Sequence, residues 1–159
     1  MTIKVGDSIP SMKLMQGTAD GPKEISTDDI FKGKKVALFA VPGAFTPTCS
    51  AKHLPGYVAN AAAFKAKGVD KVVCLSVNDA FVMGAWGKAG NAGDIIMLAD
   101  GSAALTKALG LELDLTARGM GVRATRFALV AQDGKVTHLA VEPAGQFGIS
   151  SAEEVLQHV

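Results

Sequence analysis

Three short apolar runs alternate with helical patterns, and this alternation constrains the fold more than any other feature of the sequence. The runs at 35–41, 71–77 and 94–99 have the length of buried strands. The predicted helices that follow them are 48–67, ending at Gly68; 80–88, capped by Asn78 or Asp79; and 101–109, capped by Asp100. We expect Pro55-Gly56 to kink or break the first helix. Alternating strands and helices predict a mostly parallel sheet with helices on both faces.

The last third of the chain adds antiparallel structure. Two strand-like runs, 122–131 and 135–142, flank Asp133-Gly134, a dipeptide that favours a tight hairpin. A final short helix is indicated by one of two capping boxes: Ser151 with Glu154, or Ser150 with Glu153. With a turn-rich, β-like N-terminal segment, the pattern predicts an α/β three-layer α/β/α sandwich with a mixed central sheet. A thioredoxin-like fold fits this order, and so does a flavodoxin-like fold.

Length and composition narrow the class of protein. The 159 residues have the size of one domain, so we expect a single domain over 1–159. A net charge of +1 gives no electrostatic footprint for nucleic acid or an anionic membrane. The start of the chain lacks the apolar run of a secretory leader, and no apolar stretch approaches the roughly 20 residues that span a bilayer. No glycine-rich phosphate loop precedes a helix, so we expect no nucleotide, flavin or other cofactor.

The two cysteines, Cys49 and Cys74, are too few for a disulfide scaffold and favour a reducing compartment. Because the start of the chain lacks a leader, we expect the cytoplasm. Cys49 is the chemically suggestive one. It lies in the segment VPGAFTPTCSA, between the first predicted strand and the longest predicted helix. A thiol in the first turn of a helix meets unpaired backbone N–H groups and the positive end of the helix dipole, which favour the reactive thiolate. The alternative is a buried, inert cysteine.

All three arginines, Arg118, Arg123 and Arg126, lie in one short window. Arginine is favoured where a fixed, always-charged fork holds an anion, although chance or an interface salt bridge would also place arginines there. On a strand that includes residue 126, Arg126 shares a face with Ala128 and Val130, where a charge needs a partner such as a thiolate. The alternative is an arginine that reaches out to water. Arg123 is expected on the opposite face as a structural or interface residue.

The motif Pro42-x-x-x-Thr46-x-x-Cys49 resembles the active-site signature of the peroxiredoxins, and PGAFTPTCS resembles that of the type II, peroxiredoxin-5-like class. The resemblance extends over nearly the whole chain through these further segments: Val5-Gly6-Asp7 with Pro10, VCLSVND at 73–79, 81–86, Arg126-Phe127 and Val141-Glu142-Pro143. It implies a thioredoxin-like fold and a thiol-dependent peroxidase, active against hydrogen peroxide and alkyl hydroperoxides, without metal or organic cofactor. Its cellular role would be antioxidant defence and redox homeostasis.

The resemblance also implies a role for each matching residue. Cys49 is expected to attack the peroxide and become a sulfenic acid. Thr46 is expected to hydrogen-bond the thiolate and the peroxide, and Pro42 to shield the site from water. Arg126 is expected to favour the thiolate and to stabilise charge in the transition state.

Cys74 has two readings. In mid-strand, among apolar neighbours, it is expected to be a core residue; the alternative is a resolving thiol that condenses with the Cys49 sulfenic acid. No cysteine follows position 74, so the downstream resolving cysteine of some type II members is absent. We therefore expect an external thiol, from glutaredoxin, glutathione or thioredoxin, to recycle the enzyme.

His53 is four residues after Cys49, so on a helix it faces the same side. It could pair with the thiol or form half of a metal site, but a helix-surface or second-shell histidine is the expected outcome. His138 and His158 have no sequence companions. The large apolar residues near predicted loops and helix starts are read either as ordinary core or, from the resemblance, as a homodimer interface: Phe45, Phe81, Met83, Trp86, Leu115 and Met120.

Two other functions fit the same fold. One is a redox sensor in which oxidised Cys49 signals to a partner, although Thr46 and Arg126 favour turnover. The other is a disulfide oxidoreductase, which would need Cys-x-x-Cys where this chain has Thr46-Pro47-Thr48-Cys49.

Overall fold

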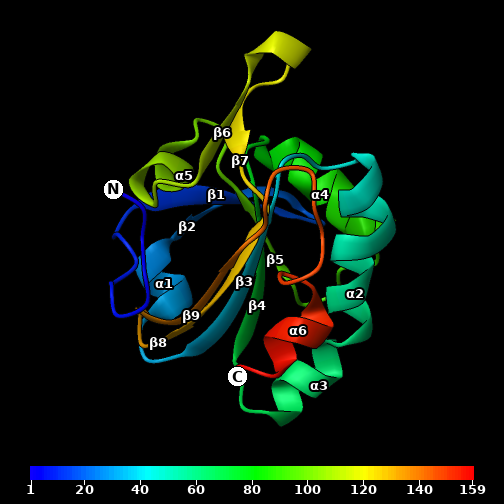
Figure 1. The fold of residues 1–159 in the computed structure, drawn as a ribbon. Coiled ribbons are helices and arrows are strands. Elements are labelled where there is room, and N and C mark those ends of the chain that lie inside the picture. Colours follow the sequence, from blue (N-terminus) through cyan, green and yellow to red (C-terminus); the bar gives the residue numbers. More distant parts are fainter.

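The computed structural model describes residues 1–159 and is built around one seven-stranded mixed sheet (Figure 1). Across the sheet the strands are β2 (Gly21–Ser26), β1 (Lys13–Thr18), β5 (Ile96–Ala99), β4 (Lys71–Ser76), β3 (Lys35–Val41), β8 (Phe127–Gln132) and β9 (Lys135–Val141). Only the central β5-β4-β3 pairs are parallel, and antiparallel hairpins flank them on both sides. This mixed order is that of a thioredoxin-like sheet, whereas a flavodoxin-like sheet is parallel throughout.

Helices cover both faces of the sheet and form the two outer layers (Figure 1). One face carries α2 (Leu54–Ala59), α3 (Ala61–Ala66), α4 (Ala80–Ala89) and α6 (Ala152–Leu156), and the other carries α1 (Thr27–Phe31) and α5 (Ala104–Ala108). No helix is long and apolar enough to cross a membrane.

Alternation along the central strands divides the apolar residues between two cores. On β3, Phe39 and Val41 face the core under α2 and α4, while Leu38 and Ala40 face the core under α1 and α5. Burial on both faces explains why the central strands read as continuous apolar runs rather than as alternating ones. Cys49 belongs to the first of these cores, so the reactive segment lies on the α2/α4 face.

Several local predictions are confirmed. Asp79 caps α4 by accepting a hydrogen bond from the Val82 amide, and Ser151 caps α6 by accepting one from Glu154. Asp133 and Gly134 both have positive φ angles, 51° and 77°, as the tight turn between β8 and β9 requires.

Other boundaries differ from the predictions. The predicted helix 48–67 consists of the π-helix η1 (Cys49–His53) followed by α2 and α3, and it breaks at Asn60 rather than at Pro55. Pro55 is the second residue of α2, directly after the π-turn, and it does not break the helix there. Asp100 accepts the amides of Leu105 and Thr106, but α5 begins only at Ala104.

The predicted strand 122–131 is two strands. The first is β7 (Gly121–Ala124) and the second is β8. β7 pairs with the preceding β6 (Glu112–Leu115), to which the short 3-10 helix η2 (Thr116–Arg118) connects it, and this two-stranded arm projects from the body (Figure 1). The chain then enters the main sheet at Phe127. Arg126 therefore lies in the junction between arm and sheet, not within a paired strand.

Candidate active site

The loop between β3 and η1 is held by contacts from two other parts of the chain. The Asn78 side chain accepts a hydrogen bond from the Ala44 amide at 3.0 Å, and an Arg123 guanidinium N–H donates to the Pro42 carbonyl at 3.3 Å. Within the loop, Phe45 has a φ of 61°, a left-handed conformation that costs energy for a residue with a side chain. The fixed loop sets the direction from which Thr48 enters the helix and so fixes the position of Cys49.

Cys49 is the first residue of η1, and its side chain is fully buried. The Leu54 amide donates to the Cys49 carbonyl, closing the wider turn of a π-helix, a distortion frequently found at functional sites. The prediction that Cys49 lies at the start of a helix thus agrees with the structure. The helix type was not predicted, because no residue pattern distinguishes a π-turn.

Arg126 is the charged partner of Cys49. Its Nη2 lies 3.1 Å from the Cys49 Sγ, although the two residues are 77 positions apart in the chain. The guanidinium is only partly buried, and its carbon lies 5.9 Å from the centre of the Phe147 ring. The sequence argument that Arg126 faces the Cys49 side of the sheet is correct, even though Arg126 precedes β8 instead of lying within it.

Thr46 differs from its predicted contact. Its hydroxyl donates to the Gly43 carbonyl at 2.6 Å instead of to the Cys49 sulfur. Because its only proton is engaged there, the oxygen remains able to accept a hydrogen bond. Thr46 is thus arranged to accept a hydrogen bond, not to donate one to the Cys49 sulfur.

His53 is fully buried, so the surface reading of this residue is wrong. Its Nδ1 lies 2.8 Å from Arg126 Nη1, and its Nε2 lies 3.0 Å from the Ser150 carbonyl oxygen. The Tyr57 hydroxyl donates to the same carbonyl at 2.8 Å. His53 therefore contacts Arg126, not Cys49, and it lies behind the guanidinium that contacts the sulfur.

Glu142 holds the segment that supplies the Ser150 carbonyl. One oxygen, Oε2, accepts from the Gly148 amide at 2.6 Å, the Ser150 amide at 2.8 Å and the Ser150 hydroxyl at 2.7 Å. Burial opposes the charged form, but these hydrogen bonds, with the Ile149 amide, bring the pKa of Glu142 below its usual value. Glu142 also donates its own amide to the Arg126 carbonyl at 2.9 Å. Sequence reasoning matched Glu142 only to a family segment and assigned it no role.

A cavity of about 300 Å³ opens next to this cluster. Its walls include Pro42, Thr48, Arg126, Gln146 and Phe147. Pro42 thus lines the cavity beside Arg126, and its shielding role stays a prediction. The guanidinium of Arg126 lines this cavity and also contacts the buried sulfur, so it connects the cavity to Cys49.

Cys74 lies in the middle of β4, fully buried, with its pKa raised well above the usual thiol value by burial and by the neighbouring Cys49. This environment holds Cys74 as an un-ionised thiol and favours the core reading over the resolving one. Both cysteines are free in this structure.

The remaining candidates occupy other places. Arg123 reaches back to the Pro42 and Met120 carbonyls, so it supports the active-site loop instead of facing away from it, because it is on the arm and not on β8. His138 and His158, for which no companion was found, stack on each other with ring centres 3.8 Å apart. No three His, Cys, Asp or Glu side chains gather as a metal site.

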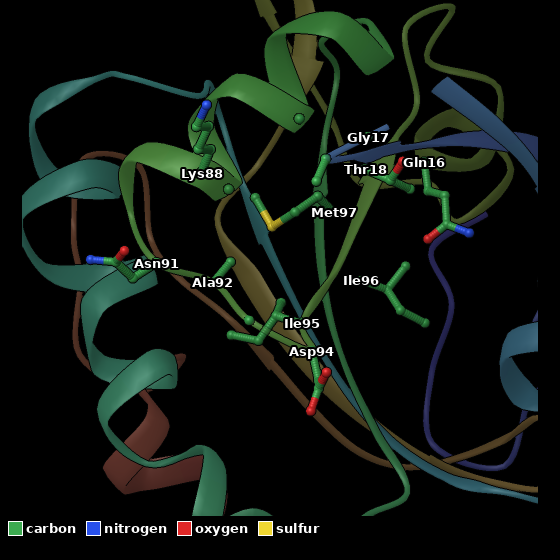
Figure 2. Close-up of a pocket in the computed structure, with 14 residues that line it drawn as sticks. Gln16, Gly17, Thr18, Lys88, Asn91, Ala92, Asp94, Ile95, Ile96 and Met97 are labelled. Atoms are coloured by element: carbon green, nitrogen blue, oxygen red, sulfur yellow. The ribbon is translucent and has the colours of Figure 1, made fainter. Parts of the chain in front are cut away.

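Figure 2 shows a larger cavity, of about 420 Å³, between β1, the second half of α4 and the segment leading into β5. Its charged side chains are Lys88 and Asp94, and none of its lining residues is a cysteine, histidine or arginine. In its wall β1 and α4 approach so closely that a Cβ on Gly17 would overlap the backbone of Gly84. Cavity size therefore does not identify the reactive site. The smaller cavity is the one lined by Arg126, which contacts the Cys49 sulfur.

Comparison with known proteins gives one consistent result over almost the entire chain. The family model described as Redoxin matches residues 4–156. Peroxiredoxin-2C of Oryza sativa subsp. japonica is 50% identical and covers 98% of this chain and 97% of its own. The crystal structure of reduced Prx3 in complex with hydrogen peroxide from Vibrio vulnificus has a TM-score of 0.93 and 52% identity, covering 98% of each chain. Peroxiredoxin 5 from Alvinella pompejana has a TM-score of 0.87 and 36% identity, covering 98% of this chain and 97% of its own.

Proposed function

Because the chain belongs to the peroxiredoxin family, whose members are thiol-dependent peroxidases, we propose that Cys49 attacks the peroxide and that Arg126 stabilises the charge that develops. The observation that carries the proposal is the 3.1 Å contact between Arg126 Nη2 and Cys49 Sγ. A guanidinium this close can donate a charge-assisted hydrogen bond to a negatively charged sulfur. The Vibrio vulnificus Prx3 complex contains hydrogen peroxide, which supports the same substrate here.

In the first step the Cys49 thiolate attacks one peroxide oxygen. An S–O bond forms and the O–O bond breaks, so that sulfur is oxidised to the sulfenic acid and the departing oxygen leaves as hydroxide or alkoxide. That oxygen takes a proton from water and is released as water or alcohol. The Arg126 guanidinium contacts the sulfur and lines the cavity, so it is placed to stabilise the negative charge as it moves to the departing oxygen.

Thr46 and Pro42 orient the peroxide in this proposal. The Thr46 oxygen, with its proton held by the Gly43 carbonyl, accepts a hydrogen bond from the peroxide O–H and holds that hydroxyl oxygen toward the sulfur, so that the attacked oxygen keeps its hydrogen in the sulfenic acid. Pro42 closes one side of the cavity with an apolar ring and has no N–H to attract water.

Two external thiols complete the cycle. The first displaces water from the sulfenic acid to give a mixed disulfide, and the second releases the Cys49 thiol and leaves as part of a disulfide. We propose glutaredoxin, glutathione or thioredoxin as the source, because the fully buried, un-ionised Cys74 is poorly placed to serve. Two free cysteines support the cytoplasm, a reducing compartment, as the location; cell fractionation that recovers the protein elsewhere contradicts it.

Intact-mass measurement tests this cycle. We expect one equivalent of hydrogen peroxide to give a single sulfenic acid, trapped by dimedone on Cys49, which glutaredoxin with glutathione, or thioredoxin, returns to the thiol. The Cys74→Ala variant is expected to give the same adduct and the same turnover. A loss of two hydrogens, with Cys49 and Cys74 joined in one chain, contradicts the external-thiol cycle.

We also propose that the enzyme is a homodimer. Phe45, 55% exposed, and Phe81, 74% exposed, lie on adjoining segments, because Asn78 bonds the Phe45 loop just before α4 begins. Exposed aromatic residues gathered near a reactive loop are typical of an interface. Sedimentation should give twice the mass of the 16.3 kDa chain, and Phe81→Asp should shift it toward the monomer. A wild-type monomer at assay concentration overturns this proposal.

A further inference from the structure

The partners of His53 fix its proton. A backbone carbonyl only accepts hydrogen bonds and a guanidinium N–H only donates them. Nε2 faces the Ser150 carbonyl at 3.0 Å, so Nε2 carries the hydrogen; Nδ1 faces an Arg126 N–H at 2.8 Å, so Nδ1 presents its lone pair. Only the neutral imidazole with its hydrogen on Nε2 satisfies both contacts.

The surroundings keep this ring uncharged. Burial, and then the positive charge of Arg126, lower the pKa of His53 to about 3. Two contributions oppose this shift, the Ser150 carbonyl and the Glu142 carboxylate, and the Tyr57 hydroxyl donates to the same Ser150 carbonyl. A second hydrogen on Nδ1 would point directly at the Arg126 N–H, so protonation and the observed geometry are incompatible.

The rest of the cluster holds His53 in place. The Ser150 carbonyl that anchors Nε2 belongs to a residue whose amide and hydroxyl both bond Glu142. The ring itself lies between Phe39 and Phe147, with ring centres 4.9 Å and 5.0 Å away. Its Nδ1 lone pair is therefore a fixed acceptor aimed at one edge of the guanidinium.

We infer that His53 is a positioning residue for peroxide reduction, whose neutral Nδ1 holds one arm of Arg126 so that the other arm reaches the Cys49 sulfur. The inference rests on the proposed role of Arg126. Two contacts, to Nδ1 and to Sγ, fix the plane of a guanidinium that one contact would leave free to turn toward the open cavity. An acceptor without charge also leaves the positive charge of Arg126 available to the thiolate, whereas a carboxylate at position 53 would neutralise it.

Two amide substitutions separate positioning from simple packing. The Asn oxygen takes the place of Nδ1 and can accept from Arg126, while the Gln nitrogen takes the place of Nε2 and can donate to Ser150. We expect His53→Gln to lower the rate constant with hydrogen peroxide by roughly 10- to 100-fold, because a catalytic group misplaced by about 1 Å can lose up to about 100-fold in rate. We expect His53→Asn to stay within about 3-fold of wild type, since it keeps the acceptor for Arg126. In a titration followed by thiolate absorbance at 240 nm, the midpoint pH should be higher in His53→Gln than in wild type and nearly unchanged in His53→Asn.

If His53 served only to fill space, His53→Gln should react faster than His53→Asn, because Gln fills more space and keeps the hydrogen bond to the Ser150 carbonyl. His138→Gln and His138→Asn are the matched controls and should leave the rate unchanged. Equal rates in both position-53 variants, or a faster His53→Gln, overturn the inference, whereas a wild type that consumes no peroxide overturns the proposed function instead.

The native protein provides a second test that needs no variant. Nitrogen-15 NMR of the histidine rings should give a neutral His53 with its hydrogen on Nε2 throughout pH 5 to 8. A charged ring at pH 6, or a hydrogen on Nδ1, contradicts the inference.

Discussion

Peroxide consumption is expected to fall by at least about 10³-fold when Cys49 is replaced by serine. The serine oxygen takes nearly the same position, 3.1 Å from Arg126 in the native contact, so the substitution changes chemistry more than shape. A hydroxyl, however, ionises far less readily than a thiol at neutral pH, and no general base lies next to it: the nearest imidazole, His53, points its lone pair at Arg126. Stopped-flow measurement of hydrogen peroxide loss checks this result.

Cys74→Ala is the matched control for Cys49→Ser. It removes the other thiol of the chain without burying a hydroxyl in the core, and we expect its rate to stay close to wild type. If Cys49→Ser still turns over peroxide with glutaredoxin, the nucleophile has been assigned wrongly. If Cys74→Ala loses activity while remaining folded, the reading of Cys74 as a core residue is wrong.

The position of Cys49 was predictable because its causes are local. A strand, a proline-stiffened loop and a helix start are all encoded within a dozen residues, and the helix start defines where the thiol lies. Arg126 was predictable for a different reason. A charge on the face of Ala128 and Val130 has to find a partner, and this held even though β8 begins only at Phe127, one residue after Arg126.

The support behind Arg126 was not predictable from the sequence. It depends on the return of the segment 142–150 across α2, which brings the Ser150 carbonyl to His53, 97 residues earlier in the chain. The spacing of His53 from Cys49 indicated only a shared helix face. It gave no information about the π-turn or about the backbone carbonyl that sets the proton on the ring.

The separate roles of the three arginines were also not predictable from the sequence. The sequence indicated that one of them holds an anion, but their spacing does not separate their roles. The projecting arm separates them in space: Arg118 is exposed at its tip, Arg123 bonds the Pro42 carbonyl from its returning strand, and Arg126 reaches Cys49 where the arm meets the sheet. Strands β6 and β7, and so this separation, were not predicted as an arm.

Because Arg126 is the arginine of the three that contacts Cys49, we expect its replacement to have a large effect on the rate. Arg126→Gln should lower the rate constant for hydrogen peroxide by roughly 10²- to 10³-fold, the loss typical of removing a donor that stabilises developing charge. Arg126→Lys should lose less than Arg126→Gln, since it keeps the charge. It should still be slower than wild type, because one ammonium cannot contact both the sulfur and the His53 ring as the flat fork does. Single-turnover kinetics with hydrogen peroxide measure both variants.

Arg118→Gln removes the same charge from an exposed side chain in the same stretch of sequence, so it separates local chemistry from net charge. We expect it to match wild type at every ionic strength tested. Equal losses in Arg118→Gln and Arg126→Gln would mean that the arginines act through the overall field of the protein and not through contact. A full rate in Arg126→Gln would mean that the 3.1 Å contact serves only to pair a partly buried charge, and that catalysis at Cys49 rests on the helix start alone.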